Sequence, residues 1–393
     1  MSENKALGAQ TLATFEKALK DNYLPVWRNQ LNTEPTALLS KIKKVPLKSD
    51  KIVATAPIGL SGGFGFGAEG AATPASGNVQ FERFETRAKD MYVNVCISAK
   101  AVRLTGSGGA MANALDTEVK AAYETAKWNT GRSLFGNGTG KLTGISTGTG
   151  TTFTVDDVMY LKEGLIVDNI GADGAVDHSG LRIKNVDRAN KKVTFEGNSI
   201  TIDGGYLTVQ NSYNREITGL GAIYDKNITT LYGVNKAANP YLYPVEVDAG
   251  ADIDDGTITR ALREAKNNKN SNIDMILCGD DAYDAYVNYL RTNNIRVEDM
   301  SHTIQGGFKA IKFIFGNKEV DIVNESFVPT SEMWGVDSST LELHTQEWNF
   351  ADLQGGGIFN LMEGQSIYRA LLANYGDLIC TNPGGCVRIY NVA

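Results

Sequence analysis

The sequence predicts an α+β fold, because a long helical pattern, a run of short strand patterns and an alternation of the two follow one another along the chain. Its 393 residues, of which 42% are hydrophobic, are enough to bury a core and suggest roughly two or three domains. Charged residues make up 21%, so the composition excludes a disordered chain. The 42 glycines, against nine prolines, predict many turns and close backbone contacts.

Residues 1–48 are predicted to form an N-terminal arm. An amphipathic helix is expected over residues 10–31, where apolar side chains recur every three or four residues, and Pro25 kinks it or ends its first part. A shorter apolar piece follows at residues 38–42. The segment has few core residues, so we expect it to pack on something else.

Residues 49–105 are predicted to form one long β-hairpin. Its outgoing strand is expected at residues 52–56 and its return strand at residues 91–98, where apolar and polar residues alternate. The glycine-rich stretch between them, residues 59–77, cannot form a core of its own. We therefore expect an extension that is flexible or held by a partner.

Residues 106–145 contain the strongest helical pattern, which runs over residues 110–135. Its apolar residues follow i, i+4, i+7 and i+11 spacing: Leu115, Val119, Ala122 and Ala126. Gly136 supplies a stop signal, and the helix is expected to form a rod about 36 Å long.

A separate all-β unit is predicted for residues 146–216. A Gly/Thr-rich stretch leads into it, and its short strand patterns occur at regular intervals, which is typical of a small barrel or sandwich of about 65 residues. The strands are expected at residues 153–155, 165–167, 181–183, 193–195 and 207–209, with a hairpin turn at residues 189–191. The similar segments Leu142-Thr143-Gly144-Ile145 and Ile217-Thr218-Gly219-Leu220 flank the unit, so we interpret it as a domain inserted into a loop.

The last part of the chain alternates helix and strand patterns. A cap region at Asp254 precedes a predicted helix at residues 258–265. Further elements are expected in this order: a buried strand at residues 275–278, a helix at 280–290, a strand-rich stretch at 308–345, and β-prone segments at 368–392 around the Pro383-Gly384-Gly385 turn.

Two glycine-rich stretches match phosphate-binding patterns by letter only. Residues 65–70 fit the dinucleotide pattern GxGxxG, but a loop containing Pro74 follows where a helix is required. Residues 136–141 resemble a phosphate loop, but they follow a helix, and Leu142 replaces the Ser or Thr that would bind magnesium. We expect both to be plain loops, and the sequence predicts no cofactor.

Ser146 lies in a GxSxG match at residues 144–148, the pattern of a nucleophile elbow. The elbow requires a strand, a sharp turn and a helix, but a Gly/Thr linker and a strand pattern follow Ser146. The candidate bases are His178, His302 and His344, and no third group orients any of them. The sequence therefore predicts no catalytic residue and no enzyme; a hydrolase that depends on Ser146 is the alternative.

The sequence also predicts no metal site. Residues 168–174 and 252–256 suggest calcium loops, but both lack the required spacing and the closing Glu. We expect a turn at the first and helix capping at the second, and leave open a structural cation in the all-β unit. Four cysteines match no zinc pattern: Cys96, Cys278, Cys380 and Cys386. A disulfide between the last two is an alternative to buried thiols, which a reducing cytosol favours.

The net charge of −7 comes without any basic block, which argues against specific nucleic-acid recognition. The N-terminus is polar and has no apolar signal segment. No stretch reaches the roughly 18 apolar residues that a membrane helix needs. We therefore predict no membrane partner and a protein that is made and stays in the cytosol of its host.

The order of these parts resembles the major capsid proteins of tailed bacteriophages, of the Hong Kong 97 type. Four stretches are also similar to that family: residues 129–138, 214–220, 306–311 and 375–378. The resemblance covers nearly the whole chain except residues 146–216. It implies an N-arm at residues 1–48, an E-loop at 49–105, a spine helix and the start of the peripheral domain at 106–145, mainly the axial domain at 217–365, and C-terminal strands closing both domains at 366–393.

The resemblance implies a structural subunit that assembles into hexamers and pentamers of an icosahedral or prolate shell around double-stranded DNA, with non-specific DNA contact. Some relatives cross-link subunits through a Lys in the E-loop, but residues 59–77 contain no Lys, so non-covalent assembly is expected. The arm at residues 1–48 is too short for the scaffolding segment of some relatives, which implies a separate scaffolding protein or a short arm doing that work. Portal and decoration proteins are further implied partners, and the implied location is the virion, assembled in the bacterial cytoplasm.

Two other structural functions remain as alternatives. An encapsulin-like nanocompartment shares this fold and encloses enzymes in place of a genome. A phage tail-tube or surface-layer protein would form tubes or sheets in place of closed shells.

Overall fold

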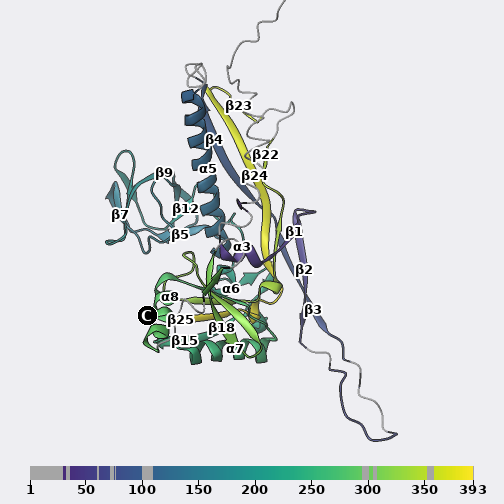
Figure 1. The fold of residues 1–393 in the computed structure, drawn as a ribbon. Helices are drawn as coiled ribbons and strands as arrows, with labels where there is room; N and C mark the ends of the chain where they lie inside the picture. The colour runs from purple at the N-terminus through teal and green to yellow at the C-terminus, as the bar shows by residue number, and fades with distance from the viewer. Residues whose placement is uncertain are drawn as a thin grey trace, which may run out of the picture.

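The computed structural model describes residues 30–31, 36–59, 62–70, 75, 77–99, 109–293, 301–303, 308–351 and 358–392. Of the helix predicted at residues 10–31, all but the last two residues lie outside this part of the chain. Figure 1 shows an elongated molecule in which a body of sheets and helices carries a helical column, a sheet at its side and a projecting hairpin. Mixed sheets with few helices agree with the predicted α+β class.

A seven-stranded sheet forms the body, in the order β15-β25-β20-β16-β19-β18-β17. Its strands are β15 (Val245–Ala251), β16 (Met275–Cys278), β17 (Ser301–Thr303), β18 (Lys309–Phe315), β19 (Lys318–Asn324), β20 (Met333–Val336) and β25 (Val387–Val392). Side chains of β16 alternate between two cores: Ile276 and Cys278 pack with helices α7 (Asp255–Lys269) and α8 (Asp280–Thr292), whereas Met275 and Leu277 face the opposite core. The predicted helices and the buried strand at 275–278 are confirmed.

The opposite core joins the body to the rest of the chain. It contains helix α3 (Ala37–Lys41), helix α6 (Gly221–Tyr224) and the end of helix α5 (Gly109–Phe135). Ala37, Leu38 and Leu39 are buried here. The described part of the predicted arm therefore packs within its own subunit.

Strand β24 (Ile367–Cys380) is the centre of a second sheet and runs along α5 (Figure 1). On one side it pairs antiparallel with β4 (Lys89–Ser98) over the whole length of β4. On its other side it pairs with β21 (Leu341–Thr345), β22 (Asn349–Phe350) and β23 (Asn360–Leu361), and β1 (Lys43–Pro46) adds to β21. Tyr123 and Ala126 of α5 pack in one cluster with Val95 and Leu372, so the predicted long helix covers this sheet.

The hairpin differs from the prediction. Strand β2 (Lys51–Ile58) pairs with β3 (Gln80–Arg87), and the predicted return strand at residues 91–98 instead belongs to β4. Residues 80–87 were missed because charged side chains hide their strand pattern; one of them, Glu85, forms a cross-strand ion pair of 2.6 Å with Lys51. Apolar and polar residues do alternate at residues 91–98, but the apolar side chains pack against α5.

A third sheet, which we call the side sheet, lies beside α5 (Figure 1). It has the order β5-β12-β8-β9-β10-β7, made of β5 (Lys141–Gly144), β7 (Thr152–Thr154), β8 (Ile166–Ile170), β9 (Val176–Asp187), β10 (Lys192–Phe195) and β12 (Tyr206–Val209). All five predicted strands are present, and Lys191, with φ of 51°, confirms the predicted turn between β9 and β10. Strand β5 pairs with β12, so the sheet begins before the boundary predicted at residue 146.

The remaining elements are short. They are β6 (Gly148–Gly150) paired with β11 (Ile200–Ile202), β13 (Thr230–Leu231) paired with β14 (Val234–Asn235), and the 3-10 turns η2 (Pro240–Leu242), η3 (Ser338–Thr340) and η4 (Pro383–Gly385). The last of these forms the turn predicted at Pro383-Gly384-Gly385.

Candidate assembly surfaces

The glycine-rich and serine motifs lie in settings that do not match their chemistry. Residues 65–70 belong to the exposed loop of the hairpin, and residues 136–141 follow α5 instead of opening a helix. Ser146 stands between β5 and β6, with its backbone N–H donating to Thr154 O at 2.9 Å. The strand–turn–helix of a nucleophile elbow is therefore not formed around Ser146.

The two candidate bases with contacts in the structure have local partners. His178 Nε2 lies 2.7 Å from Thr201 O, and His344 Nε2 lies 3.3 Å from Glu342 Oε2. His302 lies in the edge strand β17. The three histidines thus lie on β9, β21 and β17, which belong to three different sheets.

Both acidic stretches have the structural roles that we predicted. The Asp254 side chain caps α7 by accepting the Thr257 N–H at 2.6 Å, and hydrogen bonds from the Thr257 side chain and backbone lower the pKa of Asp254. The turn predicted at residues 168–174 forms at its C-terminal half, where Asp173 Oδ1 accepts the Ala175 N–H at 2.9 Å and Gly171 O accepts the Gly174 N–H at 3.0 Å. The buried Asp168 carboxylate lies in β8 and joins this strand to β9 and to the segment after β12 by accepting the Ser179 hydroxyl, the Gly180 N–H and the Asn211 N–H at 2.7–2.9 Å. Among the described residues, no group of three His, Cys, Asp or Glu side chains is arranged to hold a metal.

Three of the four cysteines are buried, and all four are free thiols. Cys380 and Cys386 lie in the core on either side of η4, as the buried-thiol interpretation expects. Cys278 is buried under α8, and its burial raises the pKa of the thiol. Cys96 on β4 is the exposed one.

The β2–β3 hairpin carries the most exposed aromatic residues of the described chain. Phe64 and Phe66 are 82% and 95% exposed, and their rings pack edge to face at 5.3 Å. Phe81 on β3 is 65% exposed. Figure 1 shows that this hairpin projects away from the body. The rings form an exposed apolar cluster that the described residues of the same chain leave uncovered.

The root of the hairpin, in contrast, is fixed to the body. Asp377 on β24 is fully buried, and its carboxylate accepts hydrogen bonds from the Thr86 hydroxyl and from the Thr218 N–H at 2.7 Å. Burial raises the pKa of Asp377, against the effect of these hydrogen bonds. Phe84 is buried beside the Tyr232 ring, 5.8 Å between centroids. The root of the hairpin is therefore buried in the body, in contrast to the exposed rings of Phe64 and Phe66.

Helix α3 is held to the body by charge. Lys41 Nζ lies 2.5 Å from Asp321 Oδ2 and 3.8 Å from Asp274 Oδ2.

The buried Glu325 carboxyl accepts hydrogen bonds from the backbone N–H groups of Phe327 and Ala37. Burial raises the pKa of Glu325 to about 8 even though these hydrogen bonds act in the opposite direction.

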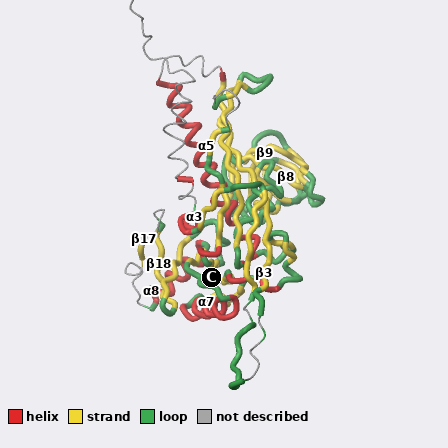
Figure 2. Tube along the Cα trace, turned by 90° about the vertical axis from the view of Figure 1, so that its right-hand side faces the viewer, coloured by secondary structure: helices red, strands yellow, loops and turns green. Residues whose placement is uncertain are grey.

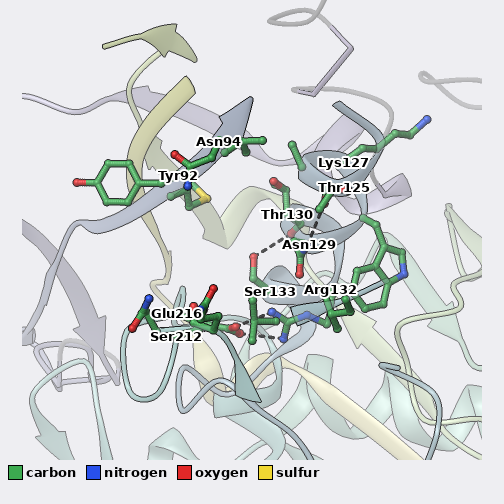
Figure 3. Close-up of a pocket in the computed structure, with 18 of the residues that line it drawn as sticks. Tyr92, Asn94, Thr125, Lys127, Asn129, Thr130, Arg132, Ser133, Ser212 and Glu216 are labelled. Atoms are coloured by element: carbon green, nitrogen blue, oxygen red, sulfur yellow. Dashed lines mark hydrogen bonds and ion pairs between the residues drawn. The ribbon is translucent and has the colours of Figure 1, made fainter. Parts of the chain in front are cut away.

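A cleft of about 1640 Å³ separates α5, β4 and β24 from the side sheet. Figure 3 shows its lining, with Tyr92 and Asn94 of β4 opposite Ser212 and Glu216. Tyr92 is about half exposed and packs edge to face on Tyr375 at 6.2 Å. Across the cleft, Lys162 Nζ of the side sheet lies 4.8 Å from the centre of the Trp128 ring of α5.

Arg132 and Glu216 meet at the floor of this cleft (Figure 3). The guanidinium makes two hydrogen bonds of 2.9 and 2.5 Å to the carboxylate, and the two side chains are only 5% and 8% exposed. Our sequence reasoning missed this pair. The sequence offered one indication of it: Arg132 and Glu216 each lie in a stretch that is similar to the capsid family, residues 129–138 and 214–220.

No protein-family model matches the sequence, and no curated protein matches it significantly. Among solved structures, the capsid asymmetric unit of cyanophage A-1(L) matches with a TM-score of 0.53 and 11% sequence identity, over 92% of this chain and 93% of that chain. The chain has the fold of a phage capsid protein. At this identity the match establishes the capsid fold alone.

Two further structures align over a similar length with lower scores. The capsid of the native GTA particle matches with a TM-score of 0.49 and 10% identity, covering 92% of this chain and 91% of that one. Mycobacterium phage Bobi matches with a TM-score of 0.47 and 10% identity, with 91% of each chain covered. Within the described part of this capsid fold, no helix combines the length and apolarity needed to span a bilayer.

Proposed function

We propose that this chain is the major capsid protein of a tailed bacteriophage, with the Hong Kong 97-like arrangement. It assembles into hexamers and pentamers of an icosahedral or prolate shell around double-stranded DNA. The observation that carries the proposal is the hairpin. Its root is fixed where the Thr86 hydroxyl donates to the buried Asp377 of β24, and its aromatic tip at Phe64 and Phe66 is left exposed by its own body.

The parts of the chain take the roles that the resemblance implies. Residues 49–105 include the E-loop, α5 is the spine helix beside the peripheral sheet around β24, and the seven-stranded sheet with α7 and α8 is the axial domain. The side sheet is an inserted domain that begins at β5, before the predicted boundary at residue 146. Its insertion is supported by the pairing of β5 with β12, because the chain enters and leaves the side sheet on neighbouring strands.

The driving force for assembly is the apolar surface of the hairpin that a single copy leaves exposed. Covering a Phe side chain contributes about 1.5–3 kcal/mol, and one copy of the chain leaves Phe64, Phe66 and Phe81 between 65% and 95% exposed. A neighbouring copy can cover them, and closed symmetry repeats that contact at every subunit. No Lys lies in residues 59–77, so the contact is non-covalent.

The partners are further copies of this chain, together with separate scaffolding, portal and decoration proteins. Contact with packaged DNA is non-specific, in keeping with a net charge of −7. The protein acts in the virion after assembly in the host bacterial cytoplasm, without a membrane, cofactor or catalytic site.

Negative-stain electron microscopy of the purified full-length protein, alone and co-expressed with its neighbouring genes, tests the proposal. Closed shells of uniform size, filled by DNA in the phage, are expected. Tubes or sheets would favour a tail-tube or surface-layer protein, and shells that contain an enzyme would favour a nanocompartment. A sample that remains monomeric under all these conditions would refute the assembly function.

A further inference from the structure

Two helices of the body carry opposite charges on their outer faces. Arg260, Arg263 and Lys266 of α7 are exposed, together with a single exposed acid, Glu264. On α8 the signs are reversed: the exposed acids are Asp280, Asp281 and Asp284, and the exposed base is Arg291. We call these surfaces the α7 face and the α8 face.

Both faces point away from the same core. The inner sides of both helices belong to one hydrophobic cluster, to which α7 contributes Ile258 and Leu262 and α8 contributes Tyr286 and Leu290. Figures 1 and 2 place both helices in the lower part of the molecule, away from the side sheet. Since both helices are fixed on one sheet with their charges outward, the two faces of one subunit cannot turn toward each other.

Inside the subunit, the charged side chains of the α7 and α8 faces make few contacts. Arg260 donates to the backbone oxygen of Asp248 at 3.1 Å, and Lys266 Nζ lies 5.9 Å from the Phe315 ring. Within the described residues, no ion pair joins any of the three bases or the three acids to an opposite charge. The helix dipole accounts for Asp280 and Asp281 in the first turn of α8 and for Lys266 in the last turn of α7. It does not account for Arg260, Arg263 or Asp284, which lie further from the favourable helix ends.

We propose that the α7 face of one subunit docks on the α8 face of a second copy, so that successive subunits contact head to tail around the ring of a capsomer. This inference rests on the proposed function and names the surface that sets the order of subunits. A contact between two different patches on neighbouring copies is heterologous, and it generates a ring when the rotation from copy to copy closes. A two-fold contact between the same faces would pair α7 with α8 twice, whereas a ring uses each face once, against two different neighbours.

The small free energy of exposed ion pairs means that the contact between the α7 and α8 faces orients the subunits more than it binds them. An exposed ion pair contributes about 0–1 kcal/mol, so three such pairs cannot hold a shell together alone. Complementary charges accelerate encounter and suppress wrong orientations, and salt screens them. The apolar hairpin contact supplies affinity, and the α7 and α8 faces supply register.

Charge reversal tests the proposal in the full-length protein. The first variant carries Arg260→Glu and Arg263→Glu, and the second carries Asp281→Lys and Asp284→Lys. In each, like charges meet at every contact, so assembly followed by light scattering at low salt should slow about ten-fold or more. A control variant with Lys184→Glu and Lys192→Glu on the exposed side sheet makes the same charge change as the first and should assemble at the wild-type rate.

Recombining the reversals gives the decisive result. The variant with all four substitutions restores opposite charges across each contact and should again form closed shells. A mixture of the first and second variants should also assemble, because the acidic α7 face of one meets the basic α8 face of the other. Strict alternation suits a six-membered ring but not a five-membered one, so the mixture should be poor in closed shells.

Circular dichroism and thermal unfolding of each unassembled variant verify that it is folded. If wild-type protein forms shells while both single-face variants assemble at the wild-type rate, this contact is wrong and the capsid function stands. Equal slowing of the control, or failure of the four-substitution variant to recover, also overturns the contact. Absence of shells in the wild-type protein, both alone and co-expressed with its neighbouring genes, refutes the capsid function itself.

Discussion

Arg132 and Glu216 form a bidentate ion pair that joins the last turn of α5 to the segment that leaves the side sheet. Both side chains are buried beneath the cleft. Two residues far apart in the sequence thus fix the spine of the molecule to the point where its chain returns from the side sheet. A planar guanidinium suits this place, because its fork matches the carboxylate geometry.

Replacing one partner of this pair should be costly. Glu216→Ala leaves the Arg132 charge buried without compensation, and we expect the free energy of unfolding to fall by about 3–5 kcal/mol. Urea unfolding of the unassembled subunit measures the loss. The double variant Arg132→Met with Glu216→Leu should recover most of it, and an equal loss in both variants would contradict a role of charge burial.

The sequence was sufficient for elements whose signal is local. The spacing of Ala122 and Ala126 indicates α5, and Asp254 marks the beginning of α7. The turn at 189–191 was also predictable, because the hairpin it closes spans only neighbouring strands. In each case the pattern and the contacts lie within a few turns or one hairpin.

What could not be predicted depends on distant partners. Residues 91–98 alternate as a hairpin strand should, but their partner is β24, which lies near the other end of the chain. The charged segment 80–87 is nevertheless a strand, because it pairs with β2 along its whole length and buries Phe84. The Arg132–Glu216 pair likewise exists only once the side sheet has returned the chain to α5.

The hairpin tip should affect assembly without affecting folding. Phe64→Ser with Phe66→Ser removes apolar surface that the subunit leaves exposed, so the melting temperature of the unassembled subunit should change by less than about 2 °C. The fraction of protein in shells, measured by sedimentation, should fall about ten-fold or more.

Phe84→Ala is the matched control, because Phe84 lies on the same hairpin but is buried at its root. This substitution should lower the free energy of unfolding by about 3–5 kcal/mol. Shells that form normally after loss of Phe64 and Phe66 would show that the tip is not an intersubunit anchor.

Glu325 should make stability depend on pH. Its pKa of about 8 in the folded protein lies above the usual Glu value of 4.5, so the folded state holds the proton more tightly. The free energy of unfolding should therefore be highest below about pH 5 for this group, fall by up to about 1.4 kcal/mol per pH unit, and level off above about pH 8. Urea unfolding at a series of pH values measures the slope.

Glu325→Gln provides the comparison, because the neutral amide keeps a carbonyl oxygen for the Ala37 and Phe327 N–H groups. The variant should lack this part of the pH dependence and should be more stable than the wild type at pH 8. Identical pH profiles for the two proteins would exclude Glu325 as the titrating group.

The side sheet should be removable as a unit. The Asn214 N–H donates to Thr139 O at 2.8 Å, so the chain is closed into a loop at the base of the sheet. Deleting residues 141–211 and joining Gly140 to Ser212 through two glycines keeps the Arg132–Glu216 pair.

The deletion removes the hydrogen bond from the Tyr160 hydroxyl to Phe327 O and the Lys162–Trp128 contact, which together contribute about 1–3 kcal/mol. Cooperative thermal unfolding with a modestly lower midpoint is therefore expected, because α5 and the body keep their own cores. A deletion variant that has lost cooperative unfolding would mean that the side sheet is an integral part of the body.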